Sequence, residues 1–242
     1  MPENFLLHND GPSGYNLCYT LYYVGELTRL FIVLEGIDGC GKTTQTARIS
    51  EYIASIVGSD KVLATREPGG WDGGEAIREL VLRGNLSSMW SEFFLFMMDR
   101  CEHVCRVIAP AILCGGVVVC DRYSPSTLAY QILSRPDVGD AAAEYMIGLS
   151  DVIGLPKPDR VFFLDISPDE ARARLDARGN ANSFDVRGRE YFERVRAGYE
   201  RIMKTSSDRW VKIDAASAPD EVFDILTRHV DSLIGEGEGI NR

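Results

Sequence analysis

Five short apolar runs alternate along the chain with longer stretches in which apolar residues recur at helical spacing. The runs cover residues 30–34, 61–65, 116–120, 160–165 and 210–214. Strands that alternate with helices predict an α/β fold, in which a five-stranded, mainly parallel sheet lies between two layers of helices. Ligands bind such sheets at the carboxyl ends of the strands. Polar residues that follow the runs, among them Arg66, Asp121 and Arg122, are therefore candidate site residues.

The segment 88–113 predicts one long helix with a broad apolar face, which is expected to be mostly buried. That face carries Phe94, Met97, Met98, Cys101, Val104, Cys105 and Ile108, and an adjoining stripe carries Phe93, Phe96, Arg100 and His103. Phe96 and Arg100 are four residues apart, so they are neighbours on the helix and would suit a flat base. The alternative is a core phenylalanine and a solvated arginine, as burial habits favour.

The first apolar run leads into a glycine-rich segment, Gly36-Ile37-Asp38-Gly39-Cys40-Gly41-Lys42-Thr43, with the G-x-x-x-x-G-K-[ST] pattern of a phosphate loop. A strand before it and a helix after it are the context that this loop needs, because N–H groups converge on phosphate at the helix N-terminus. Lys42 is expected to reach the β- and γ-phosphates, and Thr43, with Asp121, to bind Mg²⁺. A chance turn is the alternative, but both flanks favour a site for a nucleoside triphosphate.

The chain has 242 residues, which suits one α/β domain with insertions or at most two small domains. Its net charge of −10 argues against bulk binding of nucleic acid, which uses clustered Lys and Arg. An acidic protein that binds anionic nucleotides must concentrate positive charge locally, so the positions of its arginines are informative.

Both ends of the chain are predicted to lie outside a catalytic domain at residues 30–234. Residues 1–29 carry no Lys or Arg before Arg29, which argues against a signal peptide, and the apolar patch 17–24 is too short to span a bilayer. This extension is interpreted as a poorly ordered tail, an extra edge strand or translation from an upstream start. Glycines and glutamates predict a disordered tail at 235–242. A cytoplasmic location with no membrane partner is expected.

The six cysteines form no C-x-x-C pair, and most lie in apolar surroundings. They are interpreted as reduced, buried thiols of a cytosolic protein. Cys101 and Cys105 are four residues apart, but the nearby His103 lies on a different helical face, which disfavours a metal site.

Four segments together resemble the thymidylate kinase family of nucleoside monophosphate kinases, which has the three-layer P-loop NTPase fold. They are residues 31–45, with the phosphate loop; 65–70, Thr-Arg-Glu-Pro-Gly-Gly; 94–100, Phe-Leu-Phe-Met-Met-Asp-Arg; and 121–131, Asp-Arg-Tyr-Ser-Pro-Ser-Thr-Leu-Ala-Tyr-Gln. Residues 157–165 are similar to the family's segment before the lid. Many families share the loop, whereas the second and fourth segments, in this order and spacing, are far more specific.

The resemblance implies transfer of the γ-phosphoryl group of ATP to dTMP, with Mg²⁺ as cofactor, in a homodimer that pairs through buried helices. The residues implied for ATP are Gly36, Ile37, Asp38, Gly39, Cys40, Gly41, Lys42, Thr43 and Thr44. The base would stack on Phe96, with Arg100 on a base carbonyl, Thr127 at the base edge, and Gln131 among the substrate-binding residues.

The resemblance also assigns binding residues to the sugar and the phosphate of the acceptor. Tyr130 would crowd the sugar 2′ position and favour deoxyribose. Asp38 would meet the 3′-hydroxyl and the metal shell, while Arg66 and Arg122 would hold the acceptor phosphate. Arg122 and Lys42 are therefore also counted as catalytic, since phosphoryl transfer depends on positioning and charge neutralisation.

The chain departs from the family in its loop and lid. Some members carry an arginine at the position of Gly39, and without it a lid, expected at about residues 172–190, must supply the charge. The usual Asp-Arg-x-Glu of the lid reads Asn182-Ser183-Phe184-Asp185. The contenders are Arg174, Arg178 and Arg187, of which Arg178, with Arg174 one turn earlier, is preferred because it precedes a mobile-looking turn. A solvated helix face is the alternative.

Two other functions stay open. One is a kinase of another deoxypyrimidine monophosphate, because a single methyl group is worth only about 1–3 kcal/mol in a pocket. The other is a non-catalytic nucleotide switch or scaffold. No asparagine precedes a lysine, so the guanine-reading Asn-Lys-x-Asp motif is absent, and the acceptor-site residues are present. These features favour an enzyme.

Overall fold

The computed structural model describes residues 30–83, 86–179, 187–205 and 207–239. The predicted N-terminal extension and the lid residues 180–186 lie outside this part of the chain. A five-stranded sheet forms the centre, in the order β2-β3-β1-β4-β5, and every adjacent pair is parallel. The strands are β1 (Leu30–Glu35), β2 (Val62–Arg66), β3 (Val117–Asp121), β4 (Arg160–Asp165) and β5 (Trp210–Asp214). The predicted parallel α/β sheet is therefore confirmed, strand by strand.

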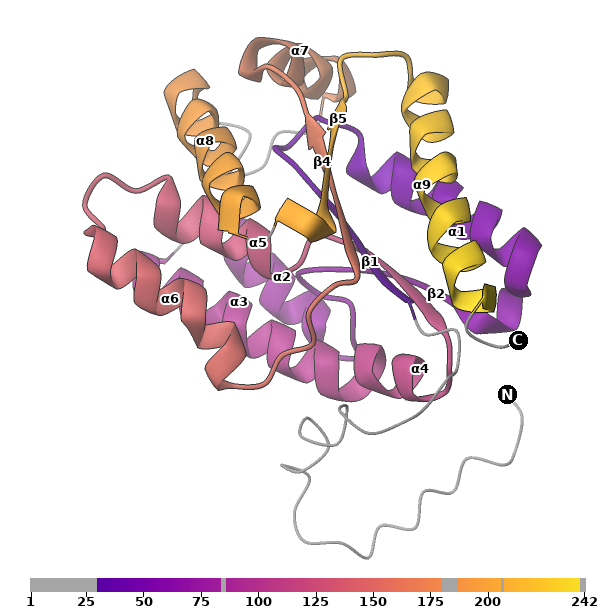
Figure 1. Cartoon of the computed structure of the whole chain (residues 1–242). Helices are drawn as coiled ribbons and strands as arrows, with labels where there is room; N and C mark the ends of the chain where they lie inside the picture. The colour runs from indigo at the N-terminus through magenta and orange to yellow at the C-terminus, as the bar shows by residue number, and fades with distance from the viewer. Residues whose placement is uncertain (1–29, 84–85, 180–186, 206, 240–242) are drawn as a thin grey trace, which may run out of the picture.

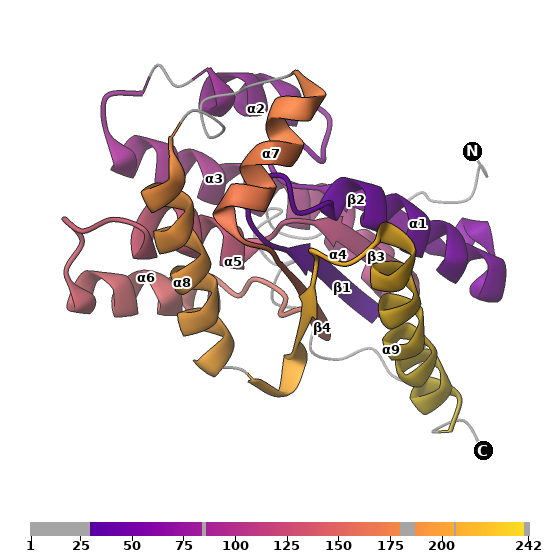
Figure 2. The same ribbon diagram turned by 90° about the horizontal axis from the view of Figure 1, so that it is seen from above.

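Helices cover both faces of the sheet, as Figures 1 and 2 show: α1 and α9 lie together on one face, and α3, α5, α6 and α8 are grouped on the other. The helices are α1 (Lys42–Val57), α2 (Gly74–Leu82), α3 (Met89–His103), α4 (Ala109–Leu113), α5 (Ser124–Thr127), α6 (Asp140–Val152), α7 (Pro168–Arg178), α8 (Arg189–Thr205) and α9 (Pro219–Gly239). One π-helical turn (Val104–Ile108) joins α3 to α4, and another (Leu128–Leu133) extends α5. Two short 3₁₀ turns (Ser59–Lys61 and Ser207–Arg209) precede β2 and β5.

The central strands of the sheet are deeply buried. Every residue of β1 and β3 is buried, as a parallel sheet covered on both faces requires. The strand register places Asp121 opposite both Leu34 and Arg66. The phosphate loop that follows β1 therefore lies at the same edge of the sheet as Arg66 and Asp121.

The long helix predicted at 88–113 forms as α3, a π-helical turn and α4, and the hydroxyl oxygen of Ser88 caps it by accepting the N–H of Trp90. Its predicted buried face is wrong in part, because Phe94 is 57% exposed and Met98 is 40% exposed. The buried side is formed instead by Phe93, Met97, Asp99, Arg100 and His103. The helix is rotated relative to the prediction because Arg100 and His103 of its polar stripe contact the buried carboxylate of Glu67. The spacing of apolar residues cannot reveal such contacts.

Helix α9 continues to Gly239 and so includes residues 235–239, which the sequence assigned to a tail. Val222, Leu226, Val230 and Ile234 are buried along this helix, and extending an existing helix costs much less than nucleating one. None of the helices in the described ranges combines the length and the apolar character needed to cross a membrane.

An ionic cluster ties α8 and β5 to β4. Arg196 of α8 donates through Nη2 to Asp165 at 2.7 Å, and Lys212 of β5 lies 3.1 Å from the same carboxylate. Burial opposes ionisation of Asp165, but the hydrogen bonds from Arg196 and Lys212 outweigh it and lower the pKa of this carboxyl group. The cluster therefore stabilises the fold most where Asp165 is ionised.

Candidate active site

The phosphate loop is held tightly against α7. Gly39 has a φ of +91°, and a Cβ atom there would lie 2.5 Å from the carbonyl oxygen of Ala171. Such a contact is too close for any side chain, and the backbone conformation also favours glycine. The loop arginine of some family members is thus incompatible with the position of α7 in this chain. The candidates to supply that positive charge therefore lie on α7 and in the segment after it.

Lys42 and Thr43 begin α1 at the end of this loop. The Lys42 side chain is buried and donates from Nζ to the carbonyl oxygen of Ile37 at 3.0 Å. Thr43 donates its hydroxyl to Oδ2 of Asp121 at 2.6 Å, whereas Oδ1 of Asp121 is buried without a hydrogen-bond partner in the described structure. The hydroxyl oxygen of Thr43 and the unpartnered Oδ1 of Asp121 are oxygen ligands of the kind that suit a hard cation such as Mg²⁺.

Asp38 and Arg122 form an ion pair at the mouth of the loop. Tyr130 joins them: its hydroxyl accepts the N–H of Asp38 at 3.0 Å and donates to Oδ2 of Asp38 at 3.2 Å. Burial opposes ionisation of Asp38, but the charges of Arg122 and Lys42 outweigh it and lower the pKa of the Asp38 carboxyl group. Asp38 therefore carries a negative charge that neutralises part of the local cationic field.

Arg122 is oriented by a buried network behind it. It has a φ of +71°, and among the described residues it is the one non-glycine residue with a positive φ. Its Nη1 donates to the carbonyl oxygen of Gly36 at 3.0 Å and to Ser126 at 2.9 Å. Ser126 and Tyr199 in turn donate to Glu35, at 2.6 and 2.9 Å, and burial raises the pKa of the Glu35 carboxyl group. The guanidinium is thereby fixed in one orientation.

Four basic side chains, Lys42, Arg66, Arg78 and Arg122, line one cavity of about 240 Å³, called here the cationic cavity. Arg66 lies at the end of β2 and forms an ion pair with Glu75 at 3.3 Å. Arg78, half-buried on α2, donates to the carbonyl oxygen of Pro68 at 3.1 Å, and its pKa is lowered by burial and then by the charge of Arg66. Their convergence in a chain of net charge −10 is suited to anionic phosphates.

A smaller cavity of about 90 Å³, the inner cavity, adjoins the cationic cavity. The two share Asp38, Glu67, Arg78 and Arg122, and the inner cavity is also lined by Pro68, Leu82, Phe96, Ser126, Thr127, Tyr130 and Gln131. The predicted base-binding residues Phe96, Thr127 and Gln131 therefore lie together. Apolar surface from Pro68, Leu82 and Phe96 beside polar groups that can fix a ligand's orientation suits a small-molecule site.

Arg100 lies directly behind the wall of the inner cavity and is 1% exposed, so the alternative of a solvated arginine is wrong. Its Nε donates to Glu67 at 2.8 Å and its Nη2 donates to Thr127 at 2.9 Å, and both partners line the cavity. Burial alone would lower the pKa of Arg100, but the neighbouring Glu67 keeps it above its ordinary value. The buried guanidinium thus stays charged.

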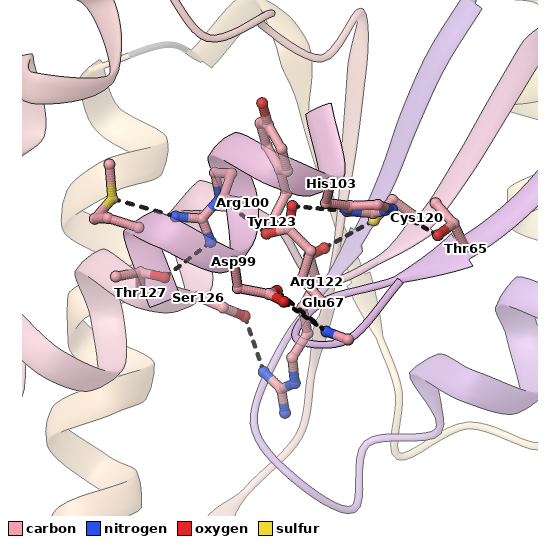
Figure 3. Close-up of polar contacts among 12 residues, drawn as sticks. Thr65, Glu67, Asp99, Arg100, His103, Cys120, Arg122, Tyr123, Ser126 and Thr127 are labelled. Carbon is pink, nitrogen blue, oxygen red and sulfur yellow. Dashed lines mark hydrogen bonds and ion pairs between the residues drawn. The ribbon is translucent and has the colours of Figure 1, made fainter. Parts of the chain in front are cut away.

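The ion pair continues into α3, as Figure 3 shows. The other oxygen of Glu67 lies 3.0 Å from Nδ1 of His103, and Nε2 of His103 lies 2.7 Å from the hydroxyl of Thr65. Because a carboxylate only accepts, Nδ1 of His103 carries a proton and donates it to Glu67. A Cβ atom on Gly70 would lie 2.5 Å from Nε2 of His103, so the glycine at this position makes room for the imidazole.

The lid candidates are placed differently from one another. Arg174 lies half-buried on α7, and Arg178 ends that helix, with its side chain and residues 180–186 outside the described structure. Arg187 lies against the other side of the site, where Nη1 donates to Tyr191 at 2.9 Å and Nη2 lies 3.4 Å from Glu92. Arg187 is therefore linked to the inner cavity through Glu92, which also accepts from Gln131 in the cavity wall.

Cysteine burial differs from the expectation in part. Cys40 and Cys120 are buried, Cys101 and Cys105 are partly exposed and Cys114 is exposed. No group of three or more His, Cys, Asp or Glu side chains that could hold a metal ion occurs among the described residues.

Several site residues received no role from the sequence. Glu67 was visible in the Arg-Glu-Pro-Gly-Gly segment, and His103 in the helical stripe. Arg78 and Glu35 gave no local signal, and neither did Tyr199, whose hydroxyl reaches Glu35 across 164 residues of sequence. The packing of α2 brings Arg78 to the site, and the packing of α8 brings Tyr199 to Glu35 at the end of β1.

A phosphate loop with its lysine and hydroxyl, set beside a cluster of arginines and a second cavity, defines the class of nucleotide-binding phosphotransferases. The comparisons with known proteins agree. The family model described as thymidylate kinase matches residues 34–225. The chain is similar to a thymidylate kinase of Caulobacter vibrioides, with 38% identity over 214 residues, 87% of this chain and 98% of the relative.

A thymidylate kinase of Gluconobacter oxydans is 37% identical over 213 residues, covering 86% of this chain and 97% of the relative. The crystal structure of thymidylate kinase from Ehrlichia chaffeensis superposes with a TM-score of 0.67 and 30% identity, covering 84% of this chain and 98% of that one. The chain belongs to the thymidylate kinase family, and it is a kinase.

Proposed function

We propose that this protein transfers the γ-phosphoryl group of ATP to dTMP, giving dTDP and ADP. One observation carries the proposal: the phosphate loop opens onto the cationic cavity, which adjoins an inner cavity lined by Phe96, Thr127 and Gln131. An acceptor with its phosphate among the arginines would place its base in the inner cavity. The names of the relatives support thymine as that base.

The chain's own residues supply positioning and charge, which is most of what phosphoryl transfer requires. The loop and Lys42 hold the donor phosphates. Arg66, Arg78 and Arg122 hold the acceptor phosphate, and a guanidinium can grip it through two hydrogen bonds. Asp38 and Tyr130 meet the sugar. The oxygens of Thr43 and Asp121 would hold Mg²⁺, which when bound neutralises charge on the donor phosphates.

A lid arginine adds the remaining positive charge when the site closes. Gly39 cannot carry a side chain against α7, so the charge comes from the lid, where Arg178 and then Arg174 are the preferred residues. Arginines that act on a transferring phosphate stabilise charge that develops in the transition state.

A coupled assay with ATP and a panel of nucleoside monophosphates tests the proposal. We expect dTMP to give the highest kcat/KM among dTMP, dUMP, dCMP, dAMP and dGMP. Arg78→Ala should raise KM for dTMP about tenfold or more, as loss of a charged hydrogen bond does. Arg83→Ala is the matched control, because Arg83 is an exposed arginine at the end of the same helix. Turnover that is highest with another monophosphate would refute dTMP as the substrate.

We also infer a homodimer. Phe94 and Met98 are exposed one turn apart on α3, an apolar surface that a second copy would cover. Phe94→Glu should convert a dimer to a monomer in analytical ultracentrifugation, whereas Ile56→Glu, on α1 at the opposite face of the sheet, should not. A wild-type monomer would contradict the inference.

A further inference from the structure

Gln131 carries an unusual polar group in the wall of the inner cavity. The residue is 3% exposed, and its Nε2 donates to Oε1 of Glu92 at 3.2 Å. Its Oε1 is buried and has no hydrogen-bond partner in the described part of the chain. A buried acceptor without a partner is unfavourable, so an amide oxygen in a cavity wall indicates a donor on the ligand.

Glu92 determines which end of the amide faces the cavity. Its side chain is 13% exposed, and its Oε1 receives both Gln131 and, at 3.4 Å, Nη2 of Arg187. A carboxylate has no proton to donate, so it can accept only the NH₂ end of the amide. The reversed amide would set two acceptor oxygens against each other, and that repulsion leaves Oε1 as the group available to a ligand.

A donor stands on the same wall. The hydroxyl oxygen of Thr127 accepts from Arg100, so the hydroxyl proton is available to the cavity. The wall therefore offers one donor, from Thr127, and one acceptor, from Gln131. A pyrimidine with a carbonyl at position 4 and N–H at position 3 matches this pair. Cytosine presents an amino group and an unprotonated nitrogen there, so it mismatches both.

We propose that Glu92 is a specificity-determining residue: by holding the amide of Gln131 with its oxygen toward the inner cavity, it selects a 4-oxo pyrimidine over a 4-amino pyrimidine. This inference rests on the proposed function, which places the base in that cavity. Glu92 does not touch the base and acts through Gln131 as a positioning residue.

The test is Glu92→Gln, which replaces the acceptor-only group by an amide that can pair with either end of Gln131. The measured quantity is the ratio of kcat/KM for dTMP to that for dCMP, or of their dissociation constants where dCMP turnover is too slow. We expect the ratio to fall about tenfold or more. In the variant the amide of Gln131 can turn and pair with cytosine, so binding of dCMP no longer leaves a buried polar group unpaired, and a penalty of this size is lost. Glu102→Gln is the matched control, since Glu102 lies on the same helix beside Arg106 but at the surface, and its ratio should not change.

A double-mutant cycle shows whether Glu92 acts through Gln131. In a Gln131→Leu background, Glu92→Gln should leave the ratio unchanged, and a full effect there would overturn the proposal. An unchanged ratio in folded Glu92→Gln would also overturn it, while activity on dTMP would leave the proposed function intact. Wild-type protein that does not phosphorylate dTMP would instead refute the proposed function. If Glu92→Gln does not fold, Glu92→Ala, which also releases the amide, should show the same loss of selectivity.

Discussion

Glu67→Gln should lower both the stability of the protein and its affinity for the acceptor. The Glu67 side chain is 3% exposed and is the ionic partner of Arg100, which is 1% exposed. The substitution keeps the shape of the side chain but removes its charge, so the guanidinium remains buried without a counterion at 2.8 Å.

The expected magnitude follows from this burial. Removing one partner of a buried ion pair costs about 3–5 kcal/mol, and we expect about 3 kcal/mol because the amide oxygen can still accept from Nε. For a chain of this size, each kcal/mol shifts Tm by about 2–4 °C, so Tm should fall by about 6–12 °C. The carboxylate also holds His103, so the network behind the inner cavity loosens and KM for dTMP should rise.

Thermal unfolding and steady-state kinetics measure the two effects. Glu102→Gln, which breaks the exposed pair with Arg106, is the control and should leave Tm unchanged. Adding Arg100→Met to Glu67→Gln should recover part of Tm by removing the uncompensated charge, without restoring KM. A Tm within about 2 °C of wild type in Glu67→Gln would refute the reasoning, because one kcal/mol already produces that shift.

Four further predictions concern the loop, the sugar, the lid and the pH dependence of stability. Lys42→Ala should abolish turnover and leave the circular dichroism spectrum intact, so activity within about tenfold of wild type would exclude the assigned donor site. Tyr130→Ala should reduce the ratio of kcat/KM for deoxy over ribo substrates, and an unchanged ratio would remove its role at the sugar. Arg178→Ala should lower kcat by up to about 10³-fold with little change in KM for the monophosphate; equal kcat would transfer the role to another lid arginine. Asp165→Asn should be less stable than wild type at neutral pH: since the folded pKa of Asp165 is lowered, its stabilisation is present above the unfolded value of about 3.9 and is lost as pH falls through the folded value. Denaturation at pH 7 and at about pH 3 should show this difference shrinking, and a constant difference would contradict the role of its pair with Arg196.

The sequence by itself determined the sheet and the loop. The five apolar runs became five parallel strands, and the glycine loop lies between β1 and α1. Both are local features: alternation of strand and helix patterns dictates parallel topology, and the loop needs only its glycines and the start of a helix. The resemblance to the family likewise rested on contiguous segments.

The tertiary structure decided which of these residues act together. Hydrophobic periodicity placed Phe94 and Met98 in the core, yet the buried ionic partners of Arg100 turn α3 so that both are exposed. Glu67 and Arg100 are 33 residues apart in sequence, Glu92 and Gln131 are 39 apart, and Glu35 and Tyr199 are 164 apart. No local pattern links such pairs, because their energy comes from desolvation and charge pairing that exist only when distant elements pack together. The sequence therefore determines where the phosphate-loop motif lies, and the packing of α2, α3 and α8 decides how the inner cavity is built.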